Sequence, residues 1–113
     1  MDEPEPLVDV AFIATAIAWR GPAPHVFLPV PAEHVPALRD AARRASYGWG
    51  VIPVVAELGG LRFATSLFPR DGGYLLPLKL AIRRAANIVP GDSASVRLQV
   101  FAPAVKDRAD RDW

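Results

Sequence analysis

The sequence contains no cysteine, and this absence removes a whole group of chemistries. A chain without thiols forms no disulfide, binds no zinc through thiolates and uses no cysteine nucleophile. No apolar run approaches the roughly 20 residues of a membrane helix. The first six residues are acidic, whereas a secretory signal begins with basic residues. We therefore expect a soluble, cytoplasmic protein that does not associate with membranes.

Histidine is scarce, and the motifs of nucleotide and acyl chemistry are missing. His25 and His34 lie nine residues apart and do not share the helix face that a metal-binding pair uses. No serine lies in a G-x-S-x-G elbow. The pairs Gly59–Gly60 and Gly72–Gly73 lack the spacing of a phosphate-binding loop. We expect no metal, no cofactor and no catalysis.

What is present suits one small folded domain. The chain has 113 residues, of which 51% are hydrophobic and 22% charged, and this is enough apolar content for a packed core. The net charge of +1 is unevenly spread, because residues 1–9 carry four acids and residues 10–102 carry ten basic and five acidic side chains. We expect an acidic, disordered segment at 1–9, a folded domain at 10–102 and a charged tail at 103–113. Such a modest excess of positive charge predicts weak nucleic-acid binding or none.

Alternation of apolar residues predicts mainly β structure with two short helices. The clearest feature is a hairpin of 51–58 with 61–68, because Gly59–Gly60 is the composition that a two-residue turn requires. Residues 10–19 and 25–28 are predicted to form another hairpin. Further strands are expected at 74–76 and 94–102. Helical spacing predicts helices at 36–45 and 78–87, and Asn87 is expected to cap the second helix.

Two stretches of the chain resemble each other. Leu28-Pro29 is followed by a helix containing Arg43-Arg44 and a strand at 52–56, while Leu76-Pro77 is followed by a helix containing Arg83-Arg84 and a strand at 96–100. A repeated unit of strand, helix, glycine turn and strand is typical of a pseudo-two-fold barrel. We therefore predict a single small closed or split β-barrel, like a double-split barrel, with two short helices.

Several short motifs, in their order along the chain, are also those of a known family. They are the run 48–54 (GWGVIPV), the run 59–69 (GGLRFATSLFP), the run 73–79 (GYLLPLK), the pair Ile82-Arg83 and the turn 90–92 (PGD). With these motifs the chain resembles the DUF1905 family of small bacterial and archaeal domains of unknown function. The resemblance spans roughly 10–102. It implies a compact β-barrel flanked by short helices, similar to the AbrB-like and MazE-like barrels, with no established activity.

The candidate binding residues gather around the second predicted helix. Lys79 and Arg83 are four residues apart and are expected to share a helix face, with Ser66 and Tyr74 on nearby strand segments. Two cations on one face need an anionic partner, which is either a carboxylate such as Asp92 or Glu57, or a bound anion. The ion pair is the more common outcome for arginine. Trp49 is interpreted either as a stacking platform or, more commonly, as a plug at the end of the barrel.

Three functions follow as hypotheses. The first is a module that binds a small anionic ligand through Lys79, Arg83, Trp49, Ser66 and Tyr74. The second is nucleic-acid binding by analogy with AbrB-like barrels, and it requires one contiguous basic face. That face would be made of Arg39, Arg43, Arg44, Lys79, Arg83 and Arg84. The third is an accessory interaction domain with no site of its own, as a monomer or a homodimer.

Overall fold

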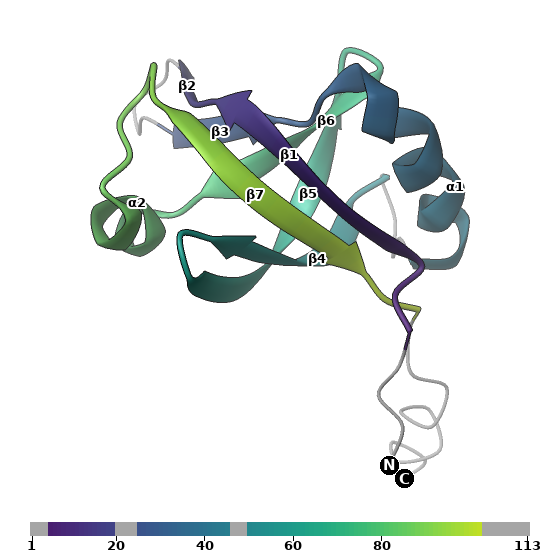
Figure 1. The fold of residues 1–113 in the computed structure, drawn as a ribbon. Helices are drawn as coiled ribbons and strands as arrows, with labels where there is room; N and C mark the ends of the chain where they lie inside the picture. Colours follow the sequence, from purple (N-terminus) through teal and green to yellow (C-terminus); the bar gives the residue numbers. More distant parts are fainter. Residues whose placement is uncertain (1–4, 20–24, 46–49, 103–113) are drawn as a thin grey trace, which may run out of the picture.

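The computed structural model describes residues 5–19, 25–45 and 50–102. These residues form a mainly β domain with two short α-helices (Figure 1). The strands are β1 (Val8–Thr15), β2 (Ile17–Trp19), β3 (His25–Pro29), β4 (Ile52–Leu58), β5 (Leu61–Arg70), β6 (Gly73–Leu78) and β7 (Ser93–Val100). The helices are α1 (Val35–Ala45), which a short 3-10 turn at Ala32–His34 precedes, and α2 (Leu80–Ala86). Trp49 and the expected tail 103–113 lie outside the described residues.

All paired strands are antiparallel, and they form one seven-stranded sheet in the order β1-β7-β4-β5-β6-β3-β2 that curls into a half-barrel. The sheet has two parts because β5 changes its partner. Residues Leu61–Leu67 pair with β4, while Phe68–Arg70 pair with β6. We call β1, β7, β4 and Leu61–Leu67 half-sheet 1. The rest of β5, with β6, β3 and β2, is half-sheet 2.

The predicted hairpin of 10–19 with 25–28 is wrong for most of its length. Only β2 pairs with β3, whereas β1 runs along β7 at the other edge of the sheet. The break falls at Ala16, whose N–H donates to the Asp92 carbonyl (2.8 Å) and whose carbonyl accepts from the Gly91 N–H (2.8 Å). Ala16 is buried, so its small side chain lets the backbone turn tightly against the chain before β7. Alternation therefore predicted extended structure correctly but gave no information on the partner strand.

The other elements follow the predictions closely, with changes of boundary, since β5 extends to Arg70 and β7 ends at Val100. The Gly59–Gly60 hairpin is confirmed, and both glycines have positive φ values of 58° and 86°. Helix α2 begins at Leu80 rather than Leu78, because β6 continues through Pro77 to Leu78, which pairs with Val26. The first strand begins at Val8 and so includes two residues of the segment 1–9.

The expected internal repeat is visible in the strand pairing. In half-sheet 2, β3 pairs with its counterpart β6, and Leu28 lies opposite Leu76. In half-sheet 1, β4 pairs with its counterpart β7. Within half-sheet 1, the order β1-β7-β4-β5 reads the same from both ends when β1 is exchanged with its counterpart β5, and β7 with β4. The order β5-β6-β3-β2 of half-sheet 2 has the same property, with β2 as the counterpart of β5. Each unit is a bent strand, a short strand, a helix and a final strand.

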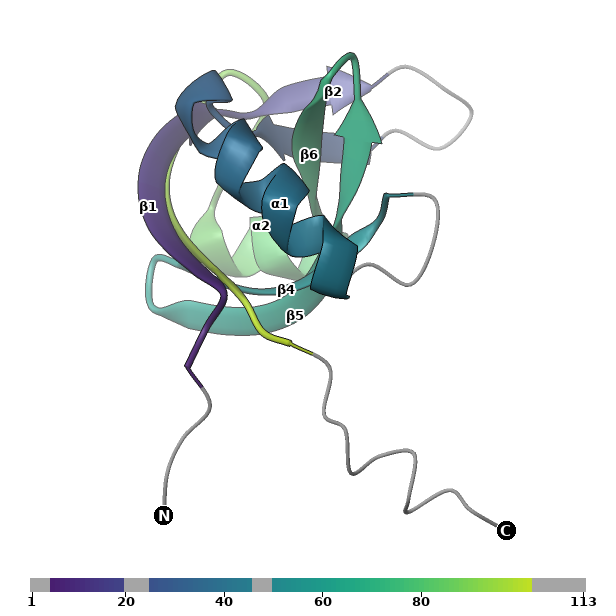
Figure 2. The same cartoon turned by 90° about the vertical axis from the view of Figure 1, so that its right-hand side faces the viewer.

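A single hydrophobic core fills the inside of the curled sheet. Every second residue of each long strand points inward, as in β4, where Ile52, Val54, Ala56 and Leu58 are buried. Helix α1 covers one end of the core with Val35, Leu38, Ala41 and Ala45. Helix α2 lies at the opposite end of the molecule (Figures 1 and 2). Each fully buried leucine contributes about 1.5–3 kcal/mol relative to an exposed one.

Candidate functional site

An open groove lies where β5 separates from β6. The two strands pair only over Phe68–Arg70 and Gly73–Leu75, so the earlier residues of β5 diverge from the end of β6. The groove has a volume of about 740 Å³. Its apolar lining residues are Phe27, Val51, Ala64, Phe68 and Pro77, and its polar ones are His25, Thr65, Ser66 and Lys79. We call it the Lys79 groove.

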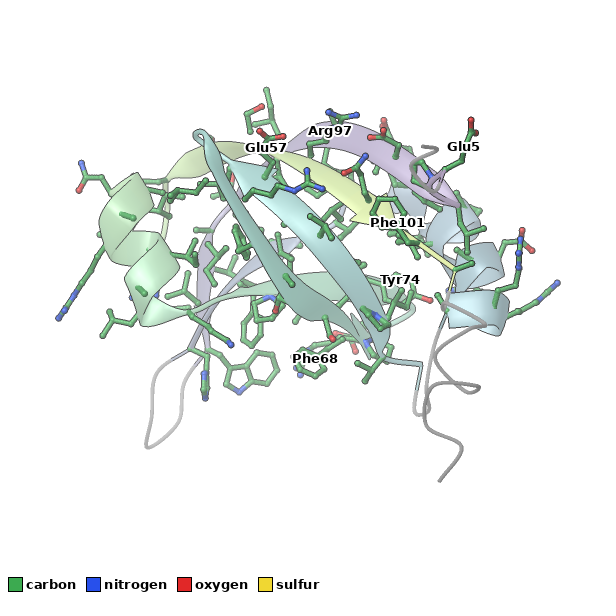
Figure 3. All side chains as sticks on the ribbon, turned by 90° about the horizontal axis from the view of Figure 1, so that it is seen from below. Glu5, Glu57, Phe68, Tyr74, Arg97 and Phe101 are labelled. Carbon is green, nitrogen blue, oxygen red and sulfur yellow. The ribbon has the colours of Figure 1, made fainter. Side chains whose placement is uncertain are left out.

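The pleat of two strands brings aromatic side chains to this groove. In β3, Val26 and Leu28 are buried in the core, so His25 and Phe27 point to the outside of half-sheet 2. In β5, Leu67 is fully buried and the next residue, Phe68, remains 44% exposed. The Phe68 side chain therefore lies on the outer surface (Figure 3). The outer face of half-sheet 2 is thus apolar although it faces solvent.

Lys79 enters the groove between a strand and a helix. It has extended backbone angles (φ −66°, ψ 158°) immediately before α2, and its side chain is exposed. Among the described residues it has no carboxylate partner within salt-bridge distance. The Asp92 carboxylate instead accepts the Val89 N–H (3.0 Å), and Glu57 lies opposite Arg62 and Arg97 on half-sheet 1. Neither of the two expected carboxylates compensates the Lys79 ammonium.

Arg83 takes a different environment from Lys79. Its Nε donates to the Leu78 carbonyl (3.3 Å), and the half-buried side chain does not line the groove. The two cations do not share a helix face as the sequence predicted, because Lys79 precedes α2 and is not part of it. The Arg83 side chain therefore ties α2 to the end of β6 and takes no part in the groove.

The remaining candidate residues are divided between groove and core. Ser66 lines the Lys79 groove, as predicted. Tyr74 is 6% exposed and belongs to the hydrophobic core, where its backbone carbonyl accepts the Val30 N–H (3.0 Å). Trp49 lies outside the described residues. The structure therefore brings Lys79 and Ser66 together and leaves Arg83 and Tyr74 outside the groove.

A second, smaller groove of about 230 Å³ lies next to the first on half-sheet 2. It shares His25, Phe27 and Phe68 with the Lys79 groove and adds Trp19, Pro69, Arg70 and Leu75. We call it the Arg70 groove. The Arg70 guanidinium carbon lies 3.5 Å from the centroid of the Trp19 ring, and the Trp19 and Phe27 rings are edge to face at 6.2 Å. Sequence reasoning did not identify these residues as a site, although the outward alternation of His25 and Phe27 was a usable signal.

The outer face of half-sheet 1 has the opposite character. Arg97 donates two hydrogen bonds to the Asp9 carboxylate, at 2.9 and 2.7 Å, and Gln99 donates a third at 3.2 Å. The hydrogen bonds from Arg97 lower the pKa of Asp9, and the same contact raises the pKa of Arg97. Glu57 and Arg97 lie on the side of the molecule opposite Phe68 (Figure 3). The charges of Asp9 and Arg97 on this face therefore compensate each other.

The described residues offer no other obvious centre for chemistry. Within residues 5–19, 25–45 and 50–102, no three residues among His, Asp and Glu are grouped so that they could hold a metal ion. In the same residues, no helix has the length and apolar character needed to cross a membrane. A third groove has Glu33 and no cation in its described lining, so the Lys79 groove and the Arg70 groove are the candidate anion-binding features.

Comparison with known proteins identifies the family but no activity. No functionally curated protein matches the chain. The sequence model of a family described as a domain of unknown function, DUF1905, matches residues 12–98. That match runs from β1 to β7 and includes both repeat units and the described lining of both grooves. The chain therefore belongs to the DUF1905 family.

Proposed function

We propose that this domain is a non-catalytic binding module that holds a small organic anion in the Lys79 groove. The observation that carries this proposal is the position of Lys79, whose ammonium has no carboxylate partner among the described residues and lines a groove with apolar walls. A charge beside low-dielectric walls attracts an anion more strongly than it does in open water. A bound anion would pair with the Lys79 ammonium, which neither Asp92 nor Glu57 does.

The walls define the rest of the ligand. Phe27, Phe68 and Pro77 offer flat apolar surfaces, and burying such a surface contributes roughly 25 cal/mol per Å². The Thr65 hydroxyl adds a polar group on the β5 side. A planar apolar body with one carboxylate or phosphate fits this lining better than an inorganic ion, which would use only Lys79.

Binding rather than catalysis is proposed because the lining lacks an activated nucleophile. His25 is the usual kind of general base, but its ring is next to the Phe27 ring (6.2 Å between centroids). Among the described lining residues, no carboxylate is present to orient the His25 imidazole. The groove therefore recognises its ligand without changing it.

We infer that the curled sheet acts as one small closed or split barrel and holds the groove rigidly. The support is that β1 and β2, which stand at opposite ends of the strand order, are separated in the chain by Ala16 alone. A scaffold of this kind positions the residues at its splits with little freedom.

Nucleic-acid binding has less support. The required basic face would combine Arg39, Arg43 and Arg44 of α1 with residues of α2, yet the two helices lie at opposite ends of the molecule (Figures 1 and 2). We expect duplex DNA to bind no more tightly than the non-specific range of roughly 10⁻⁴ to 10⁻⁶ M at physiological salt. A submicromolar, sequence-dependent affinity in a fluorescence titration would reverse the order of the two proposals.

The proposal is tested by titrating the protein with 2-naphthoate, an apolar planar anion. Wild type is compared with Lys79→Met, which removes the charge and keeps an unbranched apolar side chain, in isothermal titration calorimetry. The matched control is Arg84→Met, which removes an exposed cation from α2 that does not line the groove. We expect Lys79→Met to weaken binding by about tenfold, because one charge-assisted contact is lost. Equal affinities of all three proteins, or no binding to wild type, would refute the proposal.

Self-association through the apolar face is the rival outcome. The exposed Phe68 would then pack against a second copy instead of a ligand. Sedimentation velocity at increasing protein concentration separates the two cases, because a binding module with an accessible groove remains monomeric. A dimer that Phe68→Ser dissociates would favour the interaction domain.

A further inference from the structure

The two grooves adjoin each other on half-sheet 2, and each is lined by one cation. The Lys79 groove and the Arg70 groove share the lining residues His25, Phe27 and Phe68. Lys79 lines only the first and Arg70 only the second. We call the two adjoining grooves together the trough; its two cations lie on either side of the shared aromatic residues.

We propose that the natural ligand carries an anionic group at each end of a flat apolar body, as an aromatic dicarboxylate does. This inference rests on the proposed function and names the ligand class more narrowly. One anionic group pairs with Lys79, the second pairs with Arg70, and the apolar body lies on Phe27 and Phe68. A monoanion uses half of the site.

Arg70 is held in place for this role by Trp19. The guanidinium lies over the indole ring at 3.5 Å, and such cation–π stacking fixes the plane of the group while its N–H donors point outward at the edges. Asp71 approaches one edge, with its carboxylate 3.5 Å from the Arg70 Nε. The Asp71 side chain is 89% exposed, so this contact is weak and competes poorly with a ligand. The remaining edge offers the paired donors that bind a carboxylate.

The size of the trough fits an aromatic body. A dry protein cavity of roughly 150 Å³ binds benzene. The Arg70 groove alone has about 230 Å³ and the Lys79 groove about 740 Å³. Each of the two grooves therefore has room for an aromatic ring.

The internal repeat supplies a comparison within the same chain. The first repeat unit also has a groove, of about 510 Å³, which is lined by Phe12, Pro31 and Glu33 among others. Pro31 follows Leu28-Pro29 at the same spacing at which Lys79 follows Leu76-Pro77, so proline stands where the second unit has its cation. Glu33 adds a negative charge there. The described grooves of the two units have diverged in charge, and of these the trough of half-sheet 2 is the one that suits an anion.

The test compares pairs of probes that differ in one carboxylate. The pairs are 2-naphthoate with naphthalene-2,6-dicarboxylate, and biphenyl-4-carboxylate with biphenyl-4,4'-dicarboxylate, so that two spans between the carboxylates are sampled. Each probe is titrated by calorimetry into wild type, Lys79→Met, Arg70→Met and the control Arg84→Met. A circular dichroism spectrum and a melting curve of each variant confirm folding.

We expect at least one dicarboxylate to bind wild type about tenfold more tightly than its monocarboxylate, which corresponds to about 1.4 kcal/mol. Arg70→Met should abolish this preference and leave the monocarboxylate affinity within about twofold, whereas Lys79→Met should weaken both. Asp71→Asn should increase the preference, because it removes the competing carboxylate. Arg84→Met should change nothing.

The outcomes separate this inference from the proposed function. If the monocarboxylates bind through Lys79 but neither dicarboxylate gains affinity, or if the gain survives Arg70→Met, the two-ended ligand is refuted and the anion site remains. If no probe binds wild type, both the anion site and the two-ended ligand are refuted.

Discussion

The two outer faces of the same sheet differ in how they treat charge and apolar surface. On half-sheet 1, Arg97 and Asp9 satisfy each other across β7 and β1. On half-sheet 2, Phe68 is exposed and Lys79 has no carboxylate partner among the described residues. Inward residues of both half-sheets build one core, so the fold needs both equally. The difference lies only in the outward residues, and these are the ones that folding leaves free for a ligand.

Alternation along two strands shows how this difference arises. The outward residues of β7 are Ser93, Ser95, Arg97 and Gln99, a polar set that is typical of a solvated sheet face. The outward residues of β3 are His25, Phe27 and Pro29. The outer face of half-sheet 1 also exposes one large apolar side chain, Ile13. The two outer faces therefore differ chiefly in aromatic content, because Phe27 and Phe68 lie on half-sheet 2.

The largest effect is expected where the two half-sheets are alike. Leu76 of half-sheet 2 and Leu98 of half-sheet 1 are both fully buried in the common core. Replacing either by alanine should lower the free energy of unfolding by about 2–5 kcal/mol, through lost burial and a residual cavity. Urea denaturation followed by circular dichroism measures both. A near-neutral result for one of them would show that its half-sheet contributes little to the core.

A smaller effect is expected at the bend between β1 and β2. Ala16 is 2% exposed, and both of its backbone groups bond to the chain before β7. Ala16→Leu should lower the free energy of unfolding by about 1–3 kcal/mol, because the larger side chain overpacks the bend. Ala18→Leu is the matched control on the exposed side of β2 and should stay within about 0.5 kcal/mol. If Ala16→Leu and Ala18→Leu lowered the free energy of unfolding equally, the bend would not require a small residue at position 16.

The Asp9–Arg97 pair of half-sheet 1 should make the free energy of unfolding depend on pH, whereas Lys79 of the groove should not. The pKa of Asp9 is lowered from its ordinary value of 3.8, chiefly by hydrogen bonds from Arg97. Its contribution is therefore fully present above the unfolded value and is lost as the pH falls through the lowered folded pKa. When the pH is lowered below 4, the urea midpoint of wild type should fall, and that of Asp9→Asn should fall less. Lys79→Met should follow the wild-type curve.

The smallest effect on stability is expected at the aromatic floor of the trough. Phe68 is 44% exposed on the outer face, so Phe68→Ser should lower the free energy of unfolding by only about 1 kcal/mol, less than a truncation in the core. Binding of 2-naphthoate should nevertheless weaken, because an apolar wall of the groove is lost. A destabilisation as large as that of Leu76→Ala would place Phe68 in the core and remove the contrast between the two faces.

Much of the fold could be predicted because its signals are local. The alternation in β4 and β5 and the Gly59–Gly60 turn define a hairpin without reference to any other residue. The pairing of β1 with β7 could not be predicted, because the partner of a strand is chosen by contacts far away in the chain. The end of β6 was also missed, because Pro77 indicates a strand end and yet lies opposite Phe27 within the sheet.

The candidate site was predicted only in part, for a related reason. Lys79 and Ser66 were found from their neighbourhood in the sequence, and the structure places both in one groove. Arg83 was grouped with them through helical spacing, but Lys79 is not helical. Trp19 and Arg70 come from strands that are distant in the sequence, and only the curvature of the sheet brings the guanidinium onto the indole. A pattern of side chains along one strand or helix cannot predict a contact between residues of two different strands.

The pairing of β1 with β7 also has a consequence for how the chain is made. Val8 lies opposite Val100, so the first strand meets its only described partner at the far end of the domain. During synthesis β1 is the first strand of the domain to leave the ribosome, and it cannot pair with β7 until almost the whole domain has been synthesised. Contacts of such long sequence separation slow folding, because the chain between them must be ordered as the strands meet. The local hairpins β4–β5 and β5–β6 can form earlier, and the sheet is completed when β7 pairs with β1 and β4.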